Sequence, residues 1–407
     1  MTMLEQPNIL LSLTDQHPMA QVMPQAIAAG SAAFRALLDR HRAFWQRDEH
    51  GSFLRVSTQN PPSLPVGLPQ RDGRVITTAP QVTPDMVVPE LLIEQAARVD
   101  LSAPGGINLL HSQYLAFVGQ GDAPPQARPL TKIPWLEAML GCPIAMTDGH
   151  IWSERYRGDP REVIARGGNL EHNAWLQLYL EFVRKLPPRL GDRFLVSANT
   201  LLRGTCDLVA AILGLPEAAV GWLDNPPLMA RLLRVCTDAI LAVVEAGYEA
   251  LAPTYGGYVT TWDIWGPAPI VATQADHSSL LSPRIYEQQI MPYDLEVTAC
   301  CPLSIFHLHN NGLHVAPALM QRPEISVLEV VVDPYPTGKR KVWEVEMLQR
   351  IQQHKPLILN VAFPTYAESE WLLSQLDRRN LLFNARFEAD TPNLPDDMPG
   401  SHTWILA

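Results

Sequence analysis

The stretch that decides the fold reads Ser-Ile-Phe-His-Leu-His-Asn-Asn-Gly and covers residues Ser304–Gly312. An apolar, strand-like run leads into two histidines and stops at a polar Asn-Asn-Gly turn. Successive side chains of a strand point to opposite faces, so His307 and His309 are expected to share one face at the carboxyl end of the strand. Two imidazoles placed in this way can hold a metal ion or flank a substrate.

Length and composition favour a large globular core. The 407 residues would suffice for two or three average domains, but α/β barrels often reach this length as one domain. Hydrophobic residues make up 47% of the chain and charged residues 18%, which excludes a largely disordered protein.

The charge of the chain limits its partners and its location. A net charge of −11 argues against nucleic acid or an anionic membrane as the main partner. No apolar run approaches the roughly 20 residues that span a bilayer, and the N-terminus lacks the features of a signal peptide. Five cysteines without Cys-x-x-Cys spacing indicate reduced thiols and a cytoplasmic protein. The adjacent Cys300-Cys301 pair is expected to pack at a helix-to-strand junction.

Beyond a proline-rich N-terminal third, short strand-like runs alternate with helical ones, a pattern typical of βα units and a parallel sheet. The strand candidates are Phe53–Thr58, Pro143–Thr147, Phe194–Asn199, Ala250–Thr254, Leu303–His309, Ser326–Val332, Pro356–Ala362 and Leu381–Phe387. The helix candidates between them are Thr205–Leu213, Pro227–Ala246, Ser282–Ala299, His314–Gln321, Trp343–His354 and Tyr366–Asp377.

Eight strands with intervening helices predict a single (β/α)8 TIM barrel, with an elaborated N-terminal segment. We expect one domain over residues 1–407, of which residues 1–50 form an N-terminal helical extension. The active site of such a barrel lies at the carboxyl ends of the strands. The polar residues found there are Gln59, Asp148, His150, Asn199, Tyr255, His307, His309, Asp333, Asn360, Arg386 and Glu388.

The two histidines are the predicted metal ligands, and a carboxylate would complete the set. Glu388 on the eighth strand is the first choice for that third ligand, with Asp333 and Asp263 as alternatives. Asp333 has a second interpretation, in which it orients a histidine or caps a turn.

Catalytic roles are also expected at the strand ends. Asp148 or His150 would supply a proton, although Asp148-Gly149-His150 reads equally well as an exposed glycine turn. Arg386 would hold a substrate carboxylate, or else pair with an acid of the barrel.

The glycine-rich aromatic segment from Tyr255 to Pro267 predicts a lid or wall over the barrel mouth. Tyr255, Tyr258 and Trp262 would contact a small organic substrate, or simply cover apolar surface. Arg203 could hold a substrate carboxylate, and Asn310, directly after the second histidine, belongs to the same substrate-binding set.

Four motifs carry a resemblance to a known family. They are Pro134-Trp-Leu-Glu-Ala-Met-Leu-Gly-Cys-Pro-Ile144, Leu202-Arg-Gly-Thr-Cys-Asp-Leu208, Leu281-Ser-Pro-Arg-Ile-Tyr-Glu287 and Phe306-His-Leu-His-Asn310. In order and spacing the chain resembles the uroporphyrinogen decarboxylase superfamily from about His41 to Glu388. The resemblance is to its methyltransferase-like branches. It implies a (β/α)8 barrel, zinc as cofactor, a corrinoid protein or thiol as partner, and a homodimer.

The departures from the family pattern change what is expected. No arginine-rich N-terminal segment is present, so the acidic tetrapyrrole of the true decarboxylases is not expected as substrate. His309 stands where the methyltransferases have a cysteine, and no cysteine follows Cys301. A thiolate-rich zinc site is therefore not expected, whereas two histidines and a carboxylate would suit zinc or iron.

Three functional hypotheses remain open. The first is a metal-dependent methyltransferase acting on a small organic substrate. The second is a metal-free decarboxylase or related lyase acting on a small carboxylic acid, with His307 and His309 as general acid and electrostatic stabiliser. The third is a non-catalytic barrel that binds a corrinoid protein or small ligand. Metal analysis of the purified protein separates the first from the second.

Overall fold

A computed structural model provides the fold of the protein. The residues that it describes are 30–47, 53–58, 67–97, 115–118, 123–130, 134–167, 170, 172–198, 203–333, 342–362 and 366–387.

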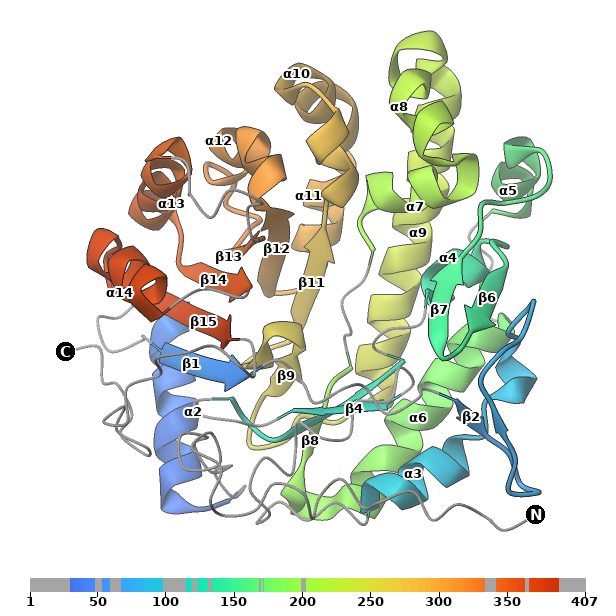
Figure 1. The fold of residues 1–407 in the computed structure, drawn as a ribbon, viewed down its shortest axis with the longest axis horizontal. Coiled ribbons are helices and arrows are strands. Elements are labelled where there is room, and N and C mark those ends of the chain that lie inside the picture. Colours follow the sequence, from blue (N-terminus) through green and yellow to red (C-terminus); the bar gives the residue numbers. More distant parts are fainter. Residues whose placement is uncertain are drawn as a thin grey trace.

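A six-stranded, all-parallel sheet organises the described residues (Figure 1). Its strands are β1 (Phe53–Thr58), β11 (Ile270–Gln274), β12 (Leu303–His309), β13 (Val327–Val332), β14 (Leu357–Ala362) and β15 (Leu381–Phe387). Their order is β1-β15-β14-β13-β12-β11, so the first and last strands of the sheet in sequence are neighbours. The strands predicted at 53–58, 303–309 and 381–387 are confirmed, and β13 and β14 begin one residue later than expected.

Helices cover the outside of this sheet. The α-helices that connect its strands from β11 to β15 are α10 (Pro283–Ile285), α11 (Met291–Ala299), α12 (Ala316–Leu319), α13 (Val342–His354) and α14 (Tyr366–Gln375). A parallel sheet covered in this way needs nearly continuous apolar strands, and β13, with its sequence Val-Leu-Glu-Val-Val-Val, is almost entirely buried. The alternation of strands and helices confirms an α/β fold with a parallel sheet.

The first part of the described chain is more irregular. Its helices are α2 (Ala32–Trp45), α3 (Pro89–Ala97), α4 (Trp135–Met139), α5 (Pro160–Arg166), α6 (Ala174–Leu190), α7 (Thr205–Leu213), α8 (Leu215–Asp224) and α9 (Pro226–Ala250). Its short strands are β2 (Leu68–Pro69), β3 (Val75–Ile76), β4 (Leu115–Val118), β5 (Gln126–Pro129), β6 (Ile144–Thr147), β7 (His150–Ser153), β8 (Leu195–Val196), β9 (Tyr258–Thr260) and β10 (Ile264–Gly266).

Two of these short strands continue the parallel arrangement. β5 pairs in parallel with β8, and Ser197, directly after β8, forms a parallel bridge with Val259 of β9. Among the described residues these pairs stand apart from the six-stranded sheet in hydrogen bonding, so closure into one barrel stays a prediction.

The predicted second barrel strand is instead one arm of a hairpin. β6 pairs antiparallel with β7, and the residues between them are Asp148 and Gly149. Both have positive φ, 48° and 79°, as a two-residue type I′ turn requires. The Asp-Gly dipeptide is the strongest short-range signal for such a hairpin, and here it outweighs the apolar run that suggested a barrel strand.

The fourth predicted strand was misplaced. Ala250 is the last residue of α9, and residues 251–254 form no strand beyond an isolated bridge between Thr254 and Gly257. The sheet strand is β11. The run Ile-Val-Ala-Thr-Gln of β11 is rich in β-branched residues, follows the prolines Pro267 and Pro269, and is fully buried. Of the expected strand at 194–199, the described residues 194–198 contain only the two residues of β8, and Asn199 lies outside the described residues.

No single helix within the described ranges is long and apolar enough to cross a bilayer. α7 and α8 pass that test only when taken together, and they bend by 109° at their junction.

A carboxyl group is buried where α7 meets α11. Asp294 is 0% exposed; it accepts hydrogen bonds from Thr205 Oγ1 (2.6 Å) and Tyr286 Oη (2.8 Å). Burial disfavours the carboxylate and, although both hydrogen bonds oppose it, raises the pKa of Asp294 to about 7. The folded protein therefore holds this proton more tightly than the unfolded chain does.

This proton predicts a specific dependence of stability on pH. A raised carboxyl pKa means that stability is lost as the pH rises from the ordinary value of 3.8 to about 7. Asp294→Asn cannot ionise and should remove this loss, which amounts to roughly 2–4 kcal/mol. We expect the Tm of the variant relative to wild type to be higher at pH 8 than at pH 5, by about 2–3 °C. Equal differences in Tm at both pH values would contradict this assignment.

Candidate metal centre

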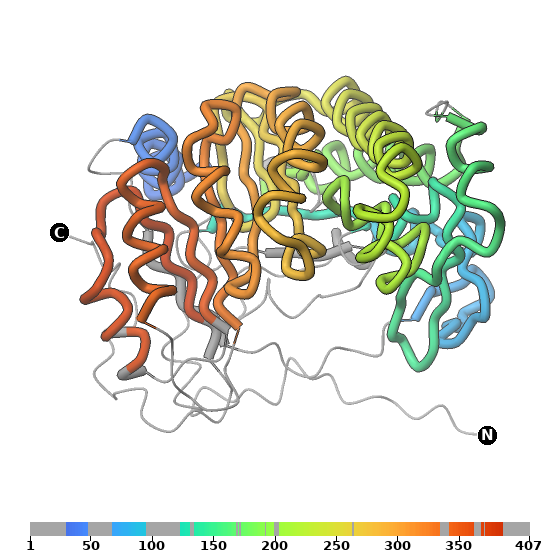
Figure 2. The backbone as a smooth tube through the Cα atoms, turned by 90° about the horizontal axis from the view of Figure 1, so that it is seen from above, coloured from blue at the N-terminus to red at the C-terminus, as the bar shows by residue number. Residues whose placement is uncertain are grey.

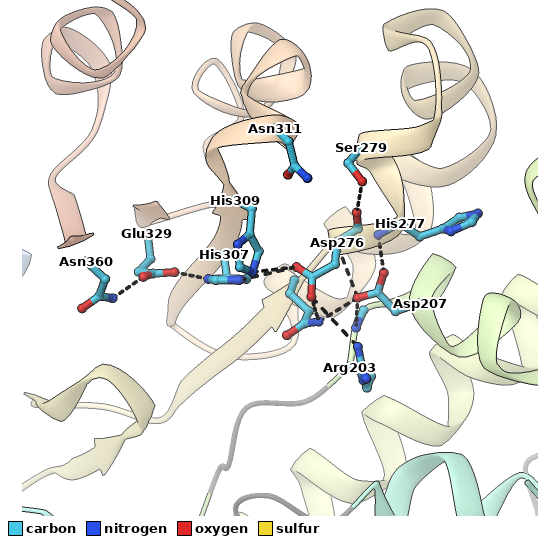
Figure 3. Close-up of polar contacts among 12 residues, drawn as sticks. Arg203, Asp207, Asp276, His277, Ser279, His307, His309, Asn311, Glu329 and Asn360 are labelled. Carbon is cyan, nitrogen blue, oxygen red and sulfur yellow. Dashed lines mark hydrogen bonds and ion pairs between the residues drawn. The ribbon is translucent and has the colours of Figure 1, made fainter. Parts of the chain in front are cut away.

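Three side chains converge at the carboxyl edge of the sheet (Figure 3). His307 and His309 lie at the end of β12, and Asp276 begins η5 (Asp276–Leu280), directly after β11. Asp276 Oδ1 lies 3.5 Å from His307 Nε2 and 3.9 Å from His309 Nε2. One ligand atom from each residue lies within 4.8 Å of the other two, a spacing that suits a single metal ion.

The register of the sheet explains this convergence. Gln274 of β11 lies opposite His307 of β12, so Asp276, two residues later, reaches the level of His309. The side chains at i and i+2 of a strand share a face, as the sequence predicted for the two histidines. Their rings meet edge to face with centroids 4.9 Å apart.

Each imidazole is oriented by a carboxylate on its other nitrogen. Glu329 of β13 is the register partner of His307 and contacts its Nδ1 atom. Asp333, just after β13, lies 2.6 Å from Nδ1 of His309. Both contacts direct the Nε2 atoms toward Asp276. Metal-binding histidines commonly have such a carboxylate partner, which fixes the ring and increases its basicity.

The Glu329 carboxylate is itself supported across the sheet. It is 0% exposed, and Asn360 of β14 donates a hydrogen bond from Nδ2 to its second oxygen. Asn384 of β15 in turn donates to Asn360 Oδ1. A chain of hydrogen bonds thus crosses four neighbouring strands and ends at the imidazole of His307. Figure 3 shows its part from Asn360 through Glu329 to His307.

The Asp276 carboxylate is held in place by Asp207, from the first turn of α7. Asp207 accepts hydrogen bonds from the backbone amides of Asp276 (3.3 Å) and His277 (2.8 Å) and from Gln274 Nε2 (2.9 Å). Gln274 Nε2 also donates to Asp276 Oδ2 at 2.7 Å. Oδ1 is left buried and without a hydrogen bond among the described residues. That oxygen is the ligand atom that faces the histidines, and its ion-pair partner is the imidazole of His307.

The charges in this group are strongly coupled. Burial disfavours the imidazolium of His307, but the carboxylates of Glu329 and Asp276 outweigh it and raise its pKa to about 10. Burial likewise works against the Asp276 carboxylate, yet the neighbouring histidines and Arg203 hold the pKa of Asp276 below its usual range. In the absence of a metal ion, His307 is therefore protonated. Its positive charge then lies beside Asp276, where a bound metal ion would otherwise supply positive charge.

The donor set fits a divalent transition metal. Two imidazole nitrogens and one carboxylate oxygen are ligands of zinc in hydrolytic enzymes and of iron in the two-histidine, one-carboxylate sites. Such sets leave coordination positions open for water or substrate. Within the described residues this is the only group of three such side chains with the required spacing.

Trp262 covers one side of His307. Its indole stacks on the imidazole with ring centroids 5.5 Å apart and planes within 19°. Trp262 lies between β9 and β10 with φ at 63°, a left-handed conformation that non-glycine residues rarely adopt. The tight connection between two paired strands thus presses this side chain against the metal centre.

Arg203 lies beside the centre and is held by a buried acid. Its Nε donates to Glu137 Oε1 at 3.0 Å, and one of its terminal nitrogens lies 4.0 Å from Asp276 Oδ2. The Arg203 side chain is 49% exposed, while that of Glu137 is 1% exposed. Burial raises the pKa of Glu137 even though Arg203 opposes the shift. Arg203 thus adds positive charge to the edge of the centre.

The other predicted substrate contacts lie farther along the wall. Tyr255 packs edge-on against Phe34 of α2, with centroids 5.0 Å apart. Tyr258 packs against Tyr248 of α9 at 4.9 Å. Asn310 is buried at the start of the turn that follows His309. The structure brings Trp262 and Arg203 to the histidines, but it directs the two tyrosine rings toward neighbouring helices.

The predicted acid–base pair is not brought to the histidines. Asp148 and His150 are exposed in the β6–β7 hairpin, which lies toward the opposite side of the molecule from β12–β15 in both views (Figures 1 and 2). The type I′ turn explains this difference, because it returns the chain antiparallel instead of sending it into the sheet.

The structure tests only one of the other candidates for the third ligand and for substrate binding. Asp333 contacts the Nδ1 atom of His309, which agrees with its orienting interpretation. Glu388 lies outside the described residues, as do the side chains of Arg386 and Asp263, so these roles stay predictions.

Sequence reasoning missed Asp276, Glu329 and Asp207. Asp276 was overlooked because β11 was not recognised as a strand, although the buried-type run before it carried the signal. Glu329 interrupts an otherwise apolar strand. A lone acid in such a run indicates a buried polar partner. Asp207 was read only as part of a motif.

Comparisons with known proteins support the fold. No protein-family model matches the chain, and no curated protein matches its sequence. Among solved structures, a methyltransferase from Methanosarcina mazei is similar, with a TM-score of 0.51 and 14% identity. The similarity covers 88% of this chain and 94% of that one. At such low identity it shows a shared fold.

Metal affinity tests the assignment of the ligands. We expect purified protein to bind one Zn²⁺ or Co²⁺ per chain, and His309→Ala or Asp276→Asn to weaken binding by more than about 100-fold. Glu329→Gln should cost about 10–100-fold, since outer-shell partners of metal-bound histidines typically contribute that much. Isothermal titration calorimetry measures these affinities, and His172→Ala, at an exposed position before α6, is the matched control. Wild-type affinity in the Asp276 and His309 variants would refute the site.

The protonation of His307 predicts a proton release on metal binding. Because the pKa of His307 is raised to about 10, the metal displaces close to one proton from this residue at pH 7. Affinity should accordingly rise by about tenfold per pH unit between pH 6 and 8. Calorimetry in buffers of different ionisation enthalpy counts the protons, and pH-independent binding without proton release would exclude a protonated His307.

Proposed function

We propose that the protein is a metal-dependent methyltransferase of the uroporphyrinogen decarboxylase superfamily that acts on a small organic substrate. The observation that carries the proposal is the convergence of two Nε2 atoms and Asp276 Oδ1, which accepts no hydrogen bond among the described residues, at the carboxyl edge of the sheet. The fold shared with a methyltransferase and the order of the sequence motifs support it.

In this proposal the chain forms one closed (β/α)8 domain over residues 1–407. Two observations support closure. The first strand pairs with the last, β1 with β15, and the parallel pairs β5–β8 and Ser197–Val259 continue the arrangement on the other side. A closed barrel would place the metal centre at its catalytic mouth.

The proposed metal is zinc, held by His307, His309 and Asp276. When bound, it would supply a Lewis acid that lowers the pKa of a ligated group and makes that group a better nucleophile at neutral pH. The residues around it have separate tasks. Glu329 and Asp333 keep both Nε2 atoms directed inward, Asp207 and Gln274 fix Asp276, and Trp262 excludes water from one face of His307.

The charge of this ligand set differs from that of thiolate-rich centres. Two neutral imidazoles and one carboxylate contribute a single negative charge, so a divalent ion keeps more of its positive charge than it does with thiolates. Glu329 and Asp333 offset part of that charge from behind the imidazoles. The centre therefore suits an oxygen or nitrogen ligand as well as a thiol.

The proposed partners are a small-molecule substrate and a corrinoid protein or thiol that exchanges the methyl group. We further propose a cytoplasmic homodimer without nucleic-acid or membrane partners, in keeping with the acidic composition.

One observation favours the metal-free lyase as a second candidate. With its pKa raised to about 10, His307 is an imidazolium at neutral pH and could stabilise the carbanion left by decarboxylation. In that reaction the proton of His307 takes the role that the metal has in the first proposal.

A methyl-transfer assay with defined metal content tests the function. The reaction is transfer of the methyl group from methylcob(III)alamin to a thiol, which yields a thioether, cob(I)alamin and a proton. We expect zinc-loaded protein to catalyse it. Removal of zinc by a chelator, or His309→Ala, should lower the rate by more than about 100-fold, beyond the effect of outer-shell changes.

His172→Ala is the control for this assay, because it leaves the centre intact. Full activity in metal-free protein would contradict the proposal. No transfer by zinc-loaded protein, together with release of carbon dioxide from small carboxylic acids by the metal-free form, would favour the lyase.

A further inference from the structure

The adjacent cysteines Cys300 and Cys301 form a second cluster of reactive side chains, apart from the metal centre. Their Sγ atoms lie 3.9 Å apart. Cys300 is exposed and Cys301 partly exposed, so the pair is open to solvent. The sequence predicted a helix-to-strand junction here, and the pair lies between α11 and β12.

The backbone around the pair explains why the two sulfurs lie side by side. Neighbouring side chains in a strand point to opposite faces, so adjacent sulfurs approach only where the chain turns between them. Cys300 ends α11 in a helical conformation, with φ at −71° and ψ at −16°. Cys301 precedes Pro302, and a following proline disfavours the helical region. The Cys-Cys-Pro sequence thus places a helical residue next to a non-helical one.

The separation of the sulfurs is close to that of a chelating pair. Two sulfurs bound to one centre at about 2.3 Å lie roughly 3.3–3.8 Å apart, the smaller value where the angle at that centre is near 90°. One centre can thus bridge the two sulfurs after a small side-chain adjustment. A disulfide between the same residues would be strained, because adjacent Cα atoms are only about 3.8 Å apart, whereas disulfides usually need about 4.4–6.8 Å. Strained disulfides are readily reduced, so the dithiol is the form expected to persist.

Cys300 also differs from the other cysteines in its pKa. The contact between the two thiols holds the pKa of Cys300 below its ordinary value, and burial opposes this shift only in part. The same contact, together with burial, raises the pKa of Cys301 well above its ordinary value. Burial raises the pKa of Cys142 to about 12 and raises the pKa values of Cys206 and Cys236 well above normal. Thiolates are the nucleophiles and metal ligands. Cys300 is therefore the first nucleophile of the pair, and Cys301 lies close enough to complete a chelate.

We propose that Cys300 and Cys301 form a two-thiolate chelating site for a thiophilic metalloid, of the class of trivalent organoarsenicals. Such a centre carries one organic substituent and takes two thiolates, so it needs no third protein ligand. For phenylarsine oxide, two S–H bonds and the As–O bond are broken, two As–S bonds form and one water molecule leaves. Arsenic remains trivalent, and no oxidant or reductant is required.

This site is independent of the proposed catalytic centre. Cys301 precedes His307 by six residues of mostly extended chain, which span about 20 Å. The histidine–carboxylate centre contains no sulfur ligand among the described residues. Occupation of one site should therefore leave the other available.

Intact-protein mass spectrometry with phenylarsine oxide tests the proposal. At one equivalent of reagent, the reduced full-length protein should gain one phenylarsenic group with loss of one water. An excess of 2-mercaptoethanol should leave the adduct in place, whereas 2,3-dimercaptopropanol should remove it, because only a dithiol competes with a chelate. Cys300→Ser and Cys301→Ser should each lose the adduct that resists the monothiol.

Cys236→Ala, which removes a buried thiol in α9, is the control and should keep the adduct. Circular dichroism verifies that each variant is folded, and Cys300→Ser changes an exposed atom only. An adduct that persists in Cys300→Ser, or one that 2-mercaptoethanol removes, would overturn the proposal. So would a vicinal disulfide that forms in air and blocks the reagent. Since no metal is needed, the result does not depend on the proposed methyl transfer.

Discussion

The buried carboxylate of Glu329 is the constraint around which the sheet is built. A charge at 0% exposure in the middle of an apolar parallel strand is costly unless it is paired and hydrogen-bonded. His307 on one neighbouring strand and Asn360 on the other meet that requirement. Stability and function are thus linked, because the contact that makes Glu329 tolerable also turns Nε2 of His307 toward Asp276.

The same arrangement explains how one edge of the sheet gathers the centre. Parallel strands end at a common edge, so residues far apart in sequence, Asp276 and Asp333, reach the same pair of imidazoles. Each histidine contacts its own carboxylate through Nδ1, Glu329 for His307 and Asp333 for His309. Both histidines face the carboxylate of Asp276 through Nε2. In the metal-free state a proton on His307 offsets part of the excess negative charge, and a divalent cation can replace it.

Much of the parallel sheet could be predicted from sequence, because its strands are apolar runs bounded by turns. The placement of His307 and His309 on one face also followed, since it depends only on strand periodicity. The third ligand did not follow. Asp276 is recognisable only once β11 is known to lie beside β12, and that pairing is a long-range contact that local pattern does not encode. Asp148 shows the opposite error, in which a local turn signal was given too little weight against an apolar run.

The central claim is that two imidazoles and one carboxylate, without sulfur, form the metal site. X-ray absorption at the zinc K-edge of the loaded protein tests it most directly. The account predicts nitrogen and oxygen ligands at about 2.0–2.2 Å, with the outer-shell scattering of two histidines. A sulfur shell near about 2.3 Å, or a spectrum without histidine scattering, would contradict it.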